Sequence, residues 1–140
     1  MGKTAAIIAT AAAIVTLTAV PASAEPVVTY QLAGTTRCLA DTGGNVVLKP
    51  CNQIANDQRW IVPISGGVDW PHNMATDKCL AAAANDVLTQ ACTTSGTQRW
   101  RRIGTSTSFQ LRNVGTNKCL TAQVTVADCT TTTAKWVGLR

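Results

Sequence analysis

The chain has 140 residues, with 12 Lys and Arg against 7 Asp and Glu and a formal net charge of +5. This mild basic balance favours solubility and weak contact with acidic surfaces, but a dedicated nucleic-acid-binding protein usually carries more charge. The hydrophobic fraction of 46% overstates the apolar character of the folded part, because the first 24 residues are rich in Ala, Ile and Val.

Those first 24 residues have the three parts of a secretory signal peptide. Lys3 precedes an apolar stretch over residues 5–20, and Pro21 to Ala24 provide a small-residue cleavage site. The stretch is shorter than the about 20 apolar residues that a membrane-spanning helix needs. We expect cleavage after Ala24, no membrane span, and a secreted, extracellular protein of residues 25–140, enough for one ordinary domain and too few for two.

The mature region is predicted to be all-β. Glycine pairs and clusters of Thr, Ser and Asn, which are typical of turns, separate its short β-prone segments. We expect strands at residues 27–32, 46–48, 60–62, 87–88, 100–103, 109–114, 124–126 and 136–137. The run Ala81–Ala84 favours a helix, but four residues are too few for a stable one.

Cysteine and tryptophan recur with a period near 40 residues. Each unit opens with a Cys-Leu pair, has a second cysteine, and ends with a tryptophan. The first cysteines are Cys38, Cys79 and Cys119, the second are Cys51, Cys92 and Cys129, and the tryptophans are Trp60, Trp100 and Trp136. Three units, roughly 25–65, 66–104 and 105–140, would share one core when closed around a pseudo-threefold axis. We expect each tryptophan to fill the same core position in its own unit.

The six cysteines predict three disulfides in an oxidising compartment. A zinc site is disfavoured because the cysteines are far apart in sequence and His72 is the only histidine. Three pairing schemes repeat identically in every unit. The scheme within each unit closes the shortest loops, and we expect it: Cys38 with Cys51, Cys79 with Cys92, and Cys119 with Cys129.

These motifs resemble the ricin B-type lectins, a β-trefoil family also classed among carbohydrate-binding modules. The resemblance covers the whole mature chain and includes the family's Gln-x-Trp element at Gln58-Arg59-Trp60 and Gln98-Arg99-Trp100. Ala134 replaces the glutamine in the third unit. The resemblance implies a twelve-stranded β-trefoil with up to three shallow sugar pockets, one per unit.

The resemblance implies that each pocket of a sugar-binding member uses an aspartate, an aromatic residue and an asparagine at fixed positions of the repeat. The aspartate place holds Ala40, Ala81 and Thr121, the aromatic place holds Lys49, Gln90 and Ala127, and the asparagine place holds Asp57, Thr97 and Thr133. Only the first unit keeps polar groups in plausible places. We expect Asp41, Asp57 and Gln58 to converge on a sugar diol beside Lys49, unless Asp41 is a turn residue and Gln58 is structural.

Trp70 is the tryptophan outside the repeat. It lies in a Gly-rich connection, residues 66–72, at the junction of the first two units. One interpretation makes it an exposed anchor for a sugar or a protein partner. The other makes it a lid over the bottom of the barrel.

Catalytic motifs are sparse. A cysteine or serine nucleophile would need a histidine partner, and His72 stands in a loop-like stretch, while every cysteine has a mate. No nucleotide-binding glycine motif appears either. From these observations together we expect that the protein is not an enzyme and that it binds no cofactor and no metal. Arg99 and Arg101 would share one face of a strand and Arg102 the other, which is typical of a solvated rim and disfavours nucleic acid.

The sequence therefore predicts a secreted, non-catalytic, monomeric carbohydrate-binding protein, lectin-like, whose partner is a glycan or polysaccharide. The alternative is a protein-interaction trefoil that has lost sugar binding, such as a toxin-accessory, adhesion or inhibitor module.

Overall fold

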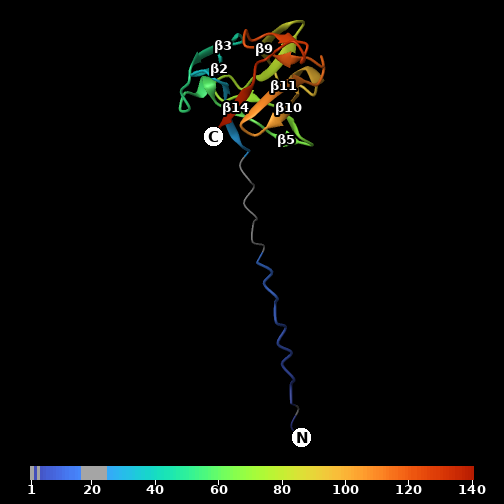
Figure 1. Ribbon diagram of the computed structural model, residues 1–140. Coiled ribbons are helices and arrows are strands. Elements are labelled where there is room, and N and C mark those ends of the chain that lie inside the picture. Colours follow the sequence, from blue (N-terminus) through green and yellow to red (C-terminus); the bar gives the residue numbers. More distant parts are fainter. Residues whose placement is uncertain (1, 3, 17–24) are drawn as a thin grey trace.

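A computed structural model of the chain describes residues 2, 4–16 and 25–140 (Figure 1). The expected cleavage site and the end of the apolar stretch lie outside these residues. Residues 4–16 are exposed and form neither helix nor strand. Within the described ranges, no helix has the length and apolar character needed to cross a membrane.

Residues 27–139 are all-β, as predicted. Short strands follow one another, with a 3-10 turn before two of the core tryptophans. The strands are β1 (Val27–Leu32), β2 (Arg37–Asp41), β3 (Val46–Pro50), β4 (Trp60–Ile61), β5 (Ile64–Ser65), β6 (Val68–Asp69), β7 (His72–Asn73), β8 (Cys79–Ala83), β9 (Asp86–Gln90), β10 (Trp100–Thr105), β11 (Ser108–Asn113), β12 (Cys119–Leu120), β13 (Val126–Ala127) and β14 (Trp136–Leu139), and the 3-10 turns are Asn56–Gln58 and Gly96–Gln98.

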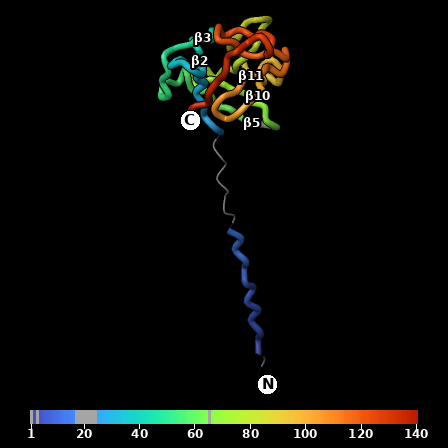
Figure 2. The backbone as a smooth tube through the Cα atoms, in the orientation of Figure 1, coloured from blue at the N-terminus to red at the C-terminus, as the bar shows by residue number. Residues whose placement is uncertain are grey.

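A closed barrel forms the centre of the fold. β1 pairs with both β4 and β14, β10 pairs with both β6 and β11, and β11 also pairs with β14. The pairs β4–β7 and β5–β6 complete the ring. The first and last strands therefore lie side by side, as the tube in Figure 2 shows near the C-terminus. Closure leaves few unpaired strand edges.

Two prolines explain why a twelve-stranded trefoil shows extra strand breaks. Pro63 separates β4 from β5, and Pro71 separates β6 from β7. Because proline has no backbone N–H to donate, it interrupts a ladder at its own position. When β4 with β5 and β6 with β7 are each taken as one bent strand, the arrangement is the β-trefoil that the resemblance implied.

A short hairpin in each unit carries the disulfide. The hairpins are β2–β3, β8–β9 and β12–β13, and each begins at or beside the first cysteine of its unit. The bonds join Cys38 to Cys51, Cys79 to Cys92 and Cys119 to Cys129. This confirms one disulfide within each repeat. Each closed loop of this size stabilises the fold by roughly 3 kcal/mol in the chain-entropy model.

The three repeat tryptophans lie in equivalent core positions and are fully buried. Each indole nitrogen donates to the carbonyl of the leucine that follows the first cysteine. The bonds are Trp60 to Leu39 at 3.3 Å, Trp100 to Leu80 at 2.9 Å and Trp136 to Leu120 at 3.4 Å. The polar part of each ring is thus satisfied inside the core, as a buried indole requires.

Some predicted elements differ from the structure. The strands that begin at or beside the first cysteines were not expected, and the run Ala81–Ala84, which is too short for a stable helix, belongs largely to strand β8. Val124, expected in a strand, has φ of 58° and lies in the turn before β13. The corresponding positions are Gly43 and Ala84, also with positive φ, so the hairpin turn sets the conformation in all three units.

Candidate functional site

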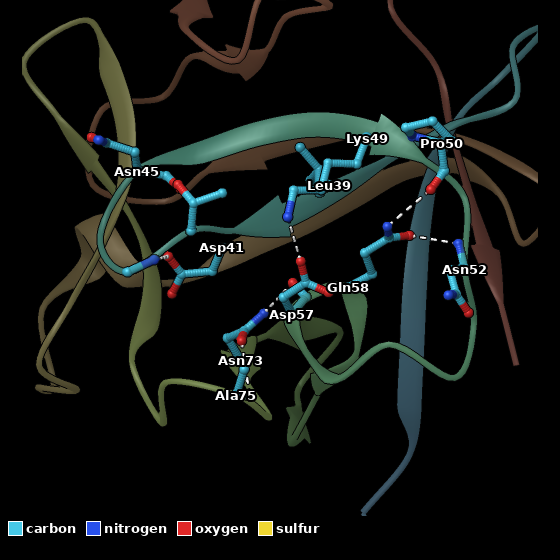
Figure 3. A network of polar contacts seen from close by, with 12 residues as sticks. Leu39, Asp41, Asn45, Lys49, Pro50, Asn52, Asp57, Gln58, Asn73 and Ala75 are labelled. Atoms are coloured by element: carbon cyan, nitrogen blue, oxygen red, sulfur yellow. Dashed lines mark hydrogen bonds and ion pairs between the residues drawn. The ribbon is translucent and has the colours of Figure 1, made fainter.

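The Gln-x-Trp glutamines fix the loop around each second cysteine. The Gln58 amide nitrogen donates to the Pro50 carbonyl at 2.9 Å, and its oxygen accepts from the Asn52 N–H at 2.7 Å (Figure 3). Gln98 makes the matching pair of bonds to Ala91 and Thr93. Both side chains are almost fully buried. Gln58 therefore serves the fold and has no amide atom free for a sugar.

A different residue supports this loop in the third repeat, where Ala134 replaces the glutamine. The Gln110 amide nitrogen, on strand β11, donates to the Cys129 carbonyl at 2.9 Å and to the Thr132 carbonyl at 3.3 Å. Ala134 leaves the space that a glutamine side chain would occupy. The loop is thus held from the neighbouring strand instead of from its own Gln-x-Trp element.

Asp41 lies inside the protein, with 2% of its surface exposed. One carboxylate oxygen accepts from the N–H groups of Gly43 and Gly44, at 3.0 and 2.8 Å. The other accepts from the hydroxyls of Thr76 and Thr89, at 2.5 and 2.8 Å. Both oxygens are therefore occupied. This corrects the expectation that Asp41 converges with Asp57 and Gln58 on a diol, because its carboxylate joins the first repeat to the second.

The bonds to Asp41 also set its protonation state. Burial by itself would raise the pKa of this carboxyl, but the hydrogen bonds, led by that from Thr76, outweigh burial. The pKa of Asp41 is therefore lowered below its usual value, and the group is a carboxylate in neutral solution.

Lys49 and Asp57 form a surface ion pair, with 2.7 Å between Nζ and Oδ2. The Asp57 backbone carbonyl accepts from the Asn73 amide at 2.8 Å, which fixes the aspartate against the second repeat (Figure 3). Both side chains keep partial exposure, at 42% and 27%. The structure thus brings Lys49 to Asp57 at the place of the first-repeat pocket, where each satisfies the charge of the other.

Trp70 is half-buried beside a small cavity. The Arg99 guanidinium lies over its ring, 5.2 Å from the centroid. Its indole nitrogen is buried and finds no hydrogen-bond partner in the described part of the chain. The cavity has a volume of about 300 Å³ and is lined by Glu25, Pro63, Trp70, His72, Asp77, Cys79 and Cys92. Trp70 is therefore neither a fully exposed anchor nor sealed within the core.

The largest cavity described lies on the third repeat, with a volume of about 510 Å³. We call it the third-repeat cavity. It is lined by Leu32, Ala33, Thr121, Ala122, Gln123, Thr125, Ala127, Thr131, Thr132, Thr133 and Ala134. Three of these, Thr121, Ala127 and Thr133, hold the family's aspartate, aromatic and asparagine places. The cavity therefore lies where the resemblance puts a sugar pocket, but in the repeat that the sequence did not favour.

Small side chains explain why the cavity opens here. Ala127 stands where the first repeat has Lys49, and Ala134 stands where it has Gln58. The loop between the paired cysteines is also shorter, with a separation of 10 against 13 in the other repeats. The run of threonines at 130–133 was the one sequence signal for this site.

The polar groups of the cavity are hydroxyls and one amide. The Thr121 and Thr125 hydroxyls bond to each other at 2.7 Å. Among the residues that the structure describes, the side chains of Gln123 and Thr133 have no hydrogen-bond partner in the protein, and both are exposed. A hydroxyl and an amide can each donate and accept, which suits the hydroxyls of a neutral sugar.

Comparison with known proteins gives a family and a fold. A family model described as the Ricin-type beta-trefoil lectin domain matches residues 28–136. No curated protein sequence matches the chain. Among solved structures the chain is similar to a designed 3-fold symmetric protein, ThreeFoil, at 14% identity and a TM-score of 0.71, covering 81% of this chain and 98% of that one.

Two natural proteins show the same similarity of fold. One is the Haemophilus ducreyi cytolethal distending toxin, at 16% identity and a TM-score of 0.66, with 86% of this chain and 87% of that chain covered. The other is a Polyporus squamosus lectin bound to a human-type influenza-binding epitope, at 12% identity and a TM-score of 0.66, with 83% and 49% covered.

Proposed function

Because the chain belongs to the ricin-type β-trefoil lectin family, we propose that it is an exported, non-catalytic protein that binds a neutral glycan in the third-repeat cavity. The observation that carries this proposal is the coincidence of the largest cavity described with Thr121, Ala127 and Thr133. A concave site with a few convergent polar groups is the usual form of a small-molecule site. Three disulfides support export, since such bonds persist in oxidising compartments.

The chemistry of the lining supports binding of an uncharged ligand without catalysis. None of its described residues is titratable, so the cavity offers no general acid or base and no charge to attract an ionic ligand. Ala122, Ala127 and Ala134 give it an apolar floor for the C–H face of a sugar ring. Without an aromatic platform or a carboxylate, the affinity should be weak, with dissociation constants of roughly millimolar.

The test is a glycan array followed by NMR titration of the protein purified with its disulfides intact, using neutral oligosaccharides. Thr133→Val removes a hydroxyl at nearly constant volume, and Gln123→Ala removes the amide. Each should weaken binding by roughly five-fold, about 1 kcal/mol for one lost hydrogen bond. Asp57→Ala, in the first repeat, is the matched control and should leave neutral-glycan binding unchanged.

A result in which Asp57→Ala abolishes binding and the third-repeat variants do not would move the site to the first repeat. A protein partner that co-purifies and is insensitive to competing sugars would favour the alternative of a protein-interaction trefoil. The absence of the family's aspartate and aromatic residues from all three repeats is the observation behind that alternative.

A further inference from the structure

Two arginines face each other on the outer side of the β10–β11 hairpin. Arg101 on β10 is directly opposite Arg112 on β11 in the antiparallel register. Their neighbours Trp100 and Leu111 point into the core and are fully buried, so the two guanidinium groups lie on the solvent side. Like charges directly opposite each other in a sheet repel and destabilise it. Such a pair is favourable only if something neutralises it.

The protein does not supply that neutralisation in the region that the structure describes. The ion pairs there join Lys49 to Asp57, His72 to Asp77, and Arg102 to Asp69. Neither Arg101 nor Arg112 takes part in any of them. Both positive charges therefore remain available to an external anion.

The two arginines also line a concave site. A cavity of about 230 Å³ is bordered by Arg101, Arg112, Val114 and Asn117. The Arg112 guanidinium donates to the side-chain oxygen of Asn117, a residue with φ of 63° in the turn after β11. On the other side, Gly67 borders the Arg101 guanidinium, because a Cβ at Gly67 would lie 4.0 Å from it, in ordinary van der Waals contact. One guanidinium is thus oriented in advance, and Arg101 is exposed while Arg112 is partly exposed.

We propose that Arg101 and Arg112 form an anion subsite that binds the sulfate or carboxylate groups of an acidic polysaccharide. An oxyanion accepts hydrogen bonds from both guanidinium forks and removes their repulsion. The choice of a polysaccharide as the carrier rests on the proposed function. A nucleic acid is disfavoured because no aromatic side chain borders this cavity to stack on a base. This subsite is distinct from the uncharged third-repeat cavity and goes beyond a site for neutral glycans.

The experiment measures binding to immobilised heparin at several salt concentrations by biolayer interferometry, using the oxidised protein. The double variant R101Q/R112Q should bind roughly ten-fold more weakly, and its salt dependence should fall by about two ion equivalents. The control R37Q removes one exposed arginine from β2 in the first repeat and should bind within about two-fold of the unaltered protein. Because Arg101 is exposed, R101Q alone provides a variant whose folding is not in question.

Desulfated heparin and polygalacturonate separate the two anions. Loss of binding on desulfation assigns the subsite to sulfate, and arginine-dependent binding to both carboxylate polymers assigns it to carboxylate. The proposal is overturned if no acidic polymer binds, if R37Q weakens binding as much as R101Q/R112Q, or if single-stranded DNA binds more tightly through the same arginines. Heparin binding that survives Thr133→Val and Gln123→Ala would show that the subsite is independent of the third-repeat cavity, so that a failure of neutral-glycan binding would not count against it.

Discussion

The Arg102 guanidinium, which is partly exposed, donates from Nε to the buried carboxylate of Asp69 at 2.5 Å. Asp69 pairs with Trp100 across the sheet, in the place that Val28 holds opposite Trp60 and Phe109 holds opposite Trp136. One third of an otherwise apolar core layer is therefore ionic. Gly138 lies beside this pair, because a Cβ there would be 3.5 Å from the Arg102 guanidinium.

Removing one member of this pair should destabilise the fold strongly. Asp69→Ala leaves the Arg102 charge without its partner in a largely apolar layer, and the free energy of unfolding should fall by about 3 kcal/mol. Tyr30 would also lose the acceptor of its hydroxyl, which lies 3.2 Å from Asp69. Denaturant unfolding with the disulfides intact measures the change. Arg101→Met, on the solvent side of the same strand, should change stability by less than about 0.5 kcal/mol. Equal losses in both variants would contradict this assignment.

Asp41 should make the fold sensitive to acid. Its pKa is lowered in the folded protein, despite the opposing effect of burial, because Thr76, Gly44, Thr89 and Gly43 donate to it. The unfolded chain therefore binds the proton more readily, so the stabilisation is complete above the usual pKa of 3.8 and is lost as the pH falls through the folded value. Asp41→Asn should cost about 1–3 kcal/mol at pH 7. In a plot of the free energy of unfolding against pH, the variant should also show a smaller decrease on the acid side, which we call the acid limb.

The control for this prediction is Asp128→Asn, which removes an exposed carboxylate on the third repeat. It should leave the acid limb unchanged. An Asp41→Asn protein that keeps the full acid dependence of the unaltered protein would show that other carboxylates govern unfolding at low pH.

Gln110 should contribute to the stability of the fold although it lies on the outer face of strand β11. Gln110→Leu removes the donor to the Cys129 and Thr132 carbonyls, and the free energy of unfolding should fall by about 1–2 kcal/mol. Hydrogen exchange should rise in residues 129–134 before it rises elsewhere. Gln90→Leu, at an exposed site on β9, is the matched control. A Gln110→Leu protein as stable as this control would mean that Ala134 needs no compensation.

The repeat could be predicted from sequence because its markers are core residues. Each tryptophan and each first cysteine has one place it can occupy when three units share a core, so their spacing identified the closed threefold arrangement. The spacing left three pairing schemes, and the preference for the shortest loops selected the one that the structure shows. The alternation of Arg101 and Arg102 was also readable, and β10 places Arg101 outward. The interpretation as a solvated rim was wrong for Arg102, which pairs with Asp69, and Arg99 lies before β10, over Trp70.

The site was harder to predict because a cavity depends on the volumes of residues that lack any motif. Ala127 and Ala134 open the cavity of the third repeat because their side chains are small. The family's aspartate and aromatic positions give no indication of this effect. Asp41 matched the chemistry of a sugar ligand, but its partners Thr76 and Thr89 come from the second repeat. No sequence spacing relates these residues, so their convergence was visible only in three dimensions.

The most direct test is to map where a neutral oligosaccharide binds, by backbone NMR shifts during titration of the oxidised protein. We predict that the shifts concentrate at Thr121–Ala127 and Thr131–Ala134, and that Lys49, Asp57 and Trp70 stay unchanged. Shifts centred on Lys49 and Asp57 or on Trp70, or no shifts at tens of millimolar sugar, would contradict a glycan site on the third repeat.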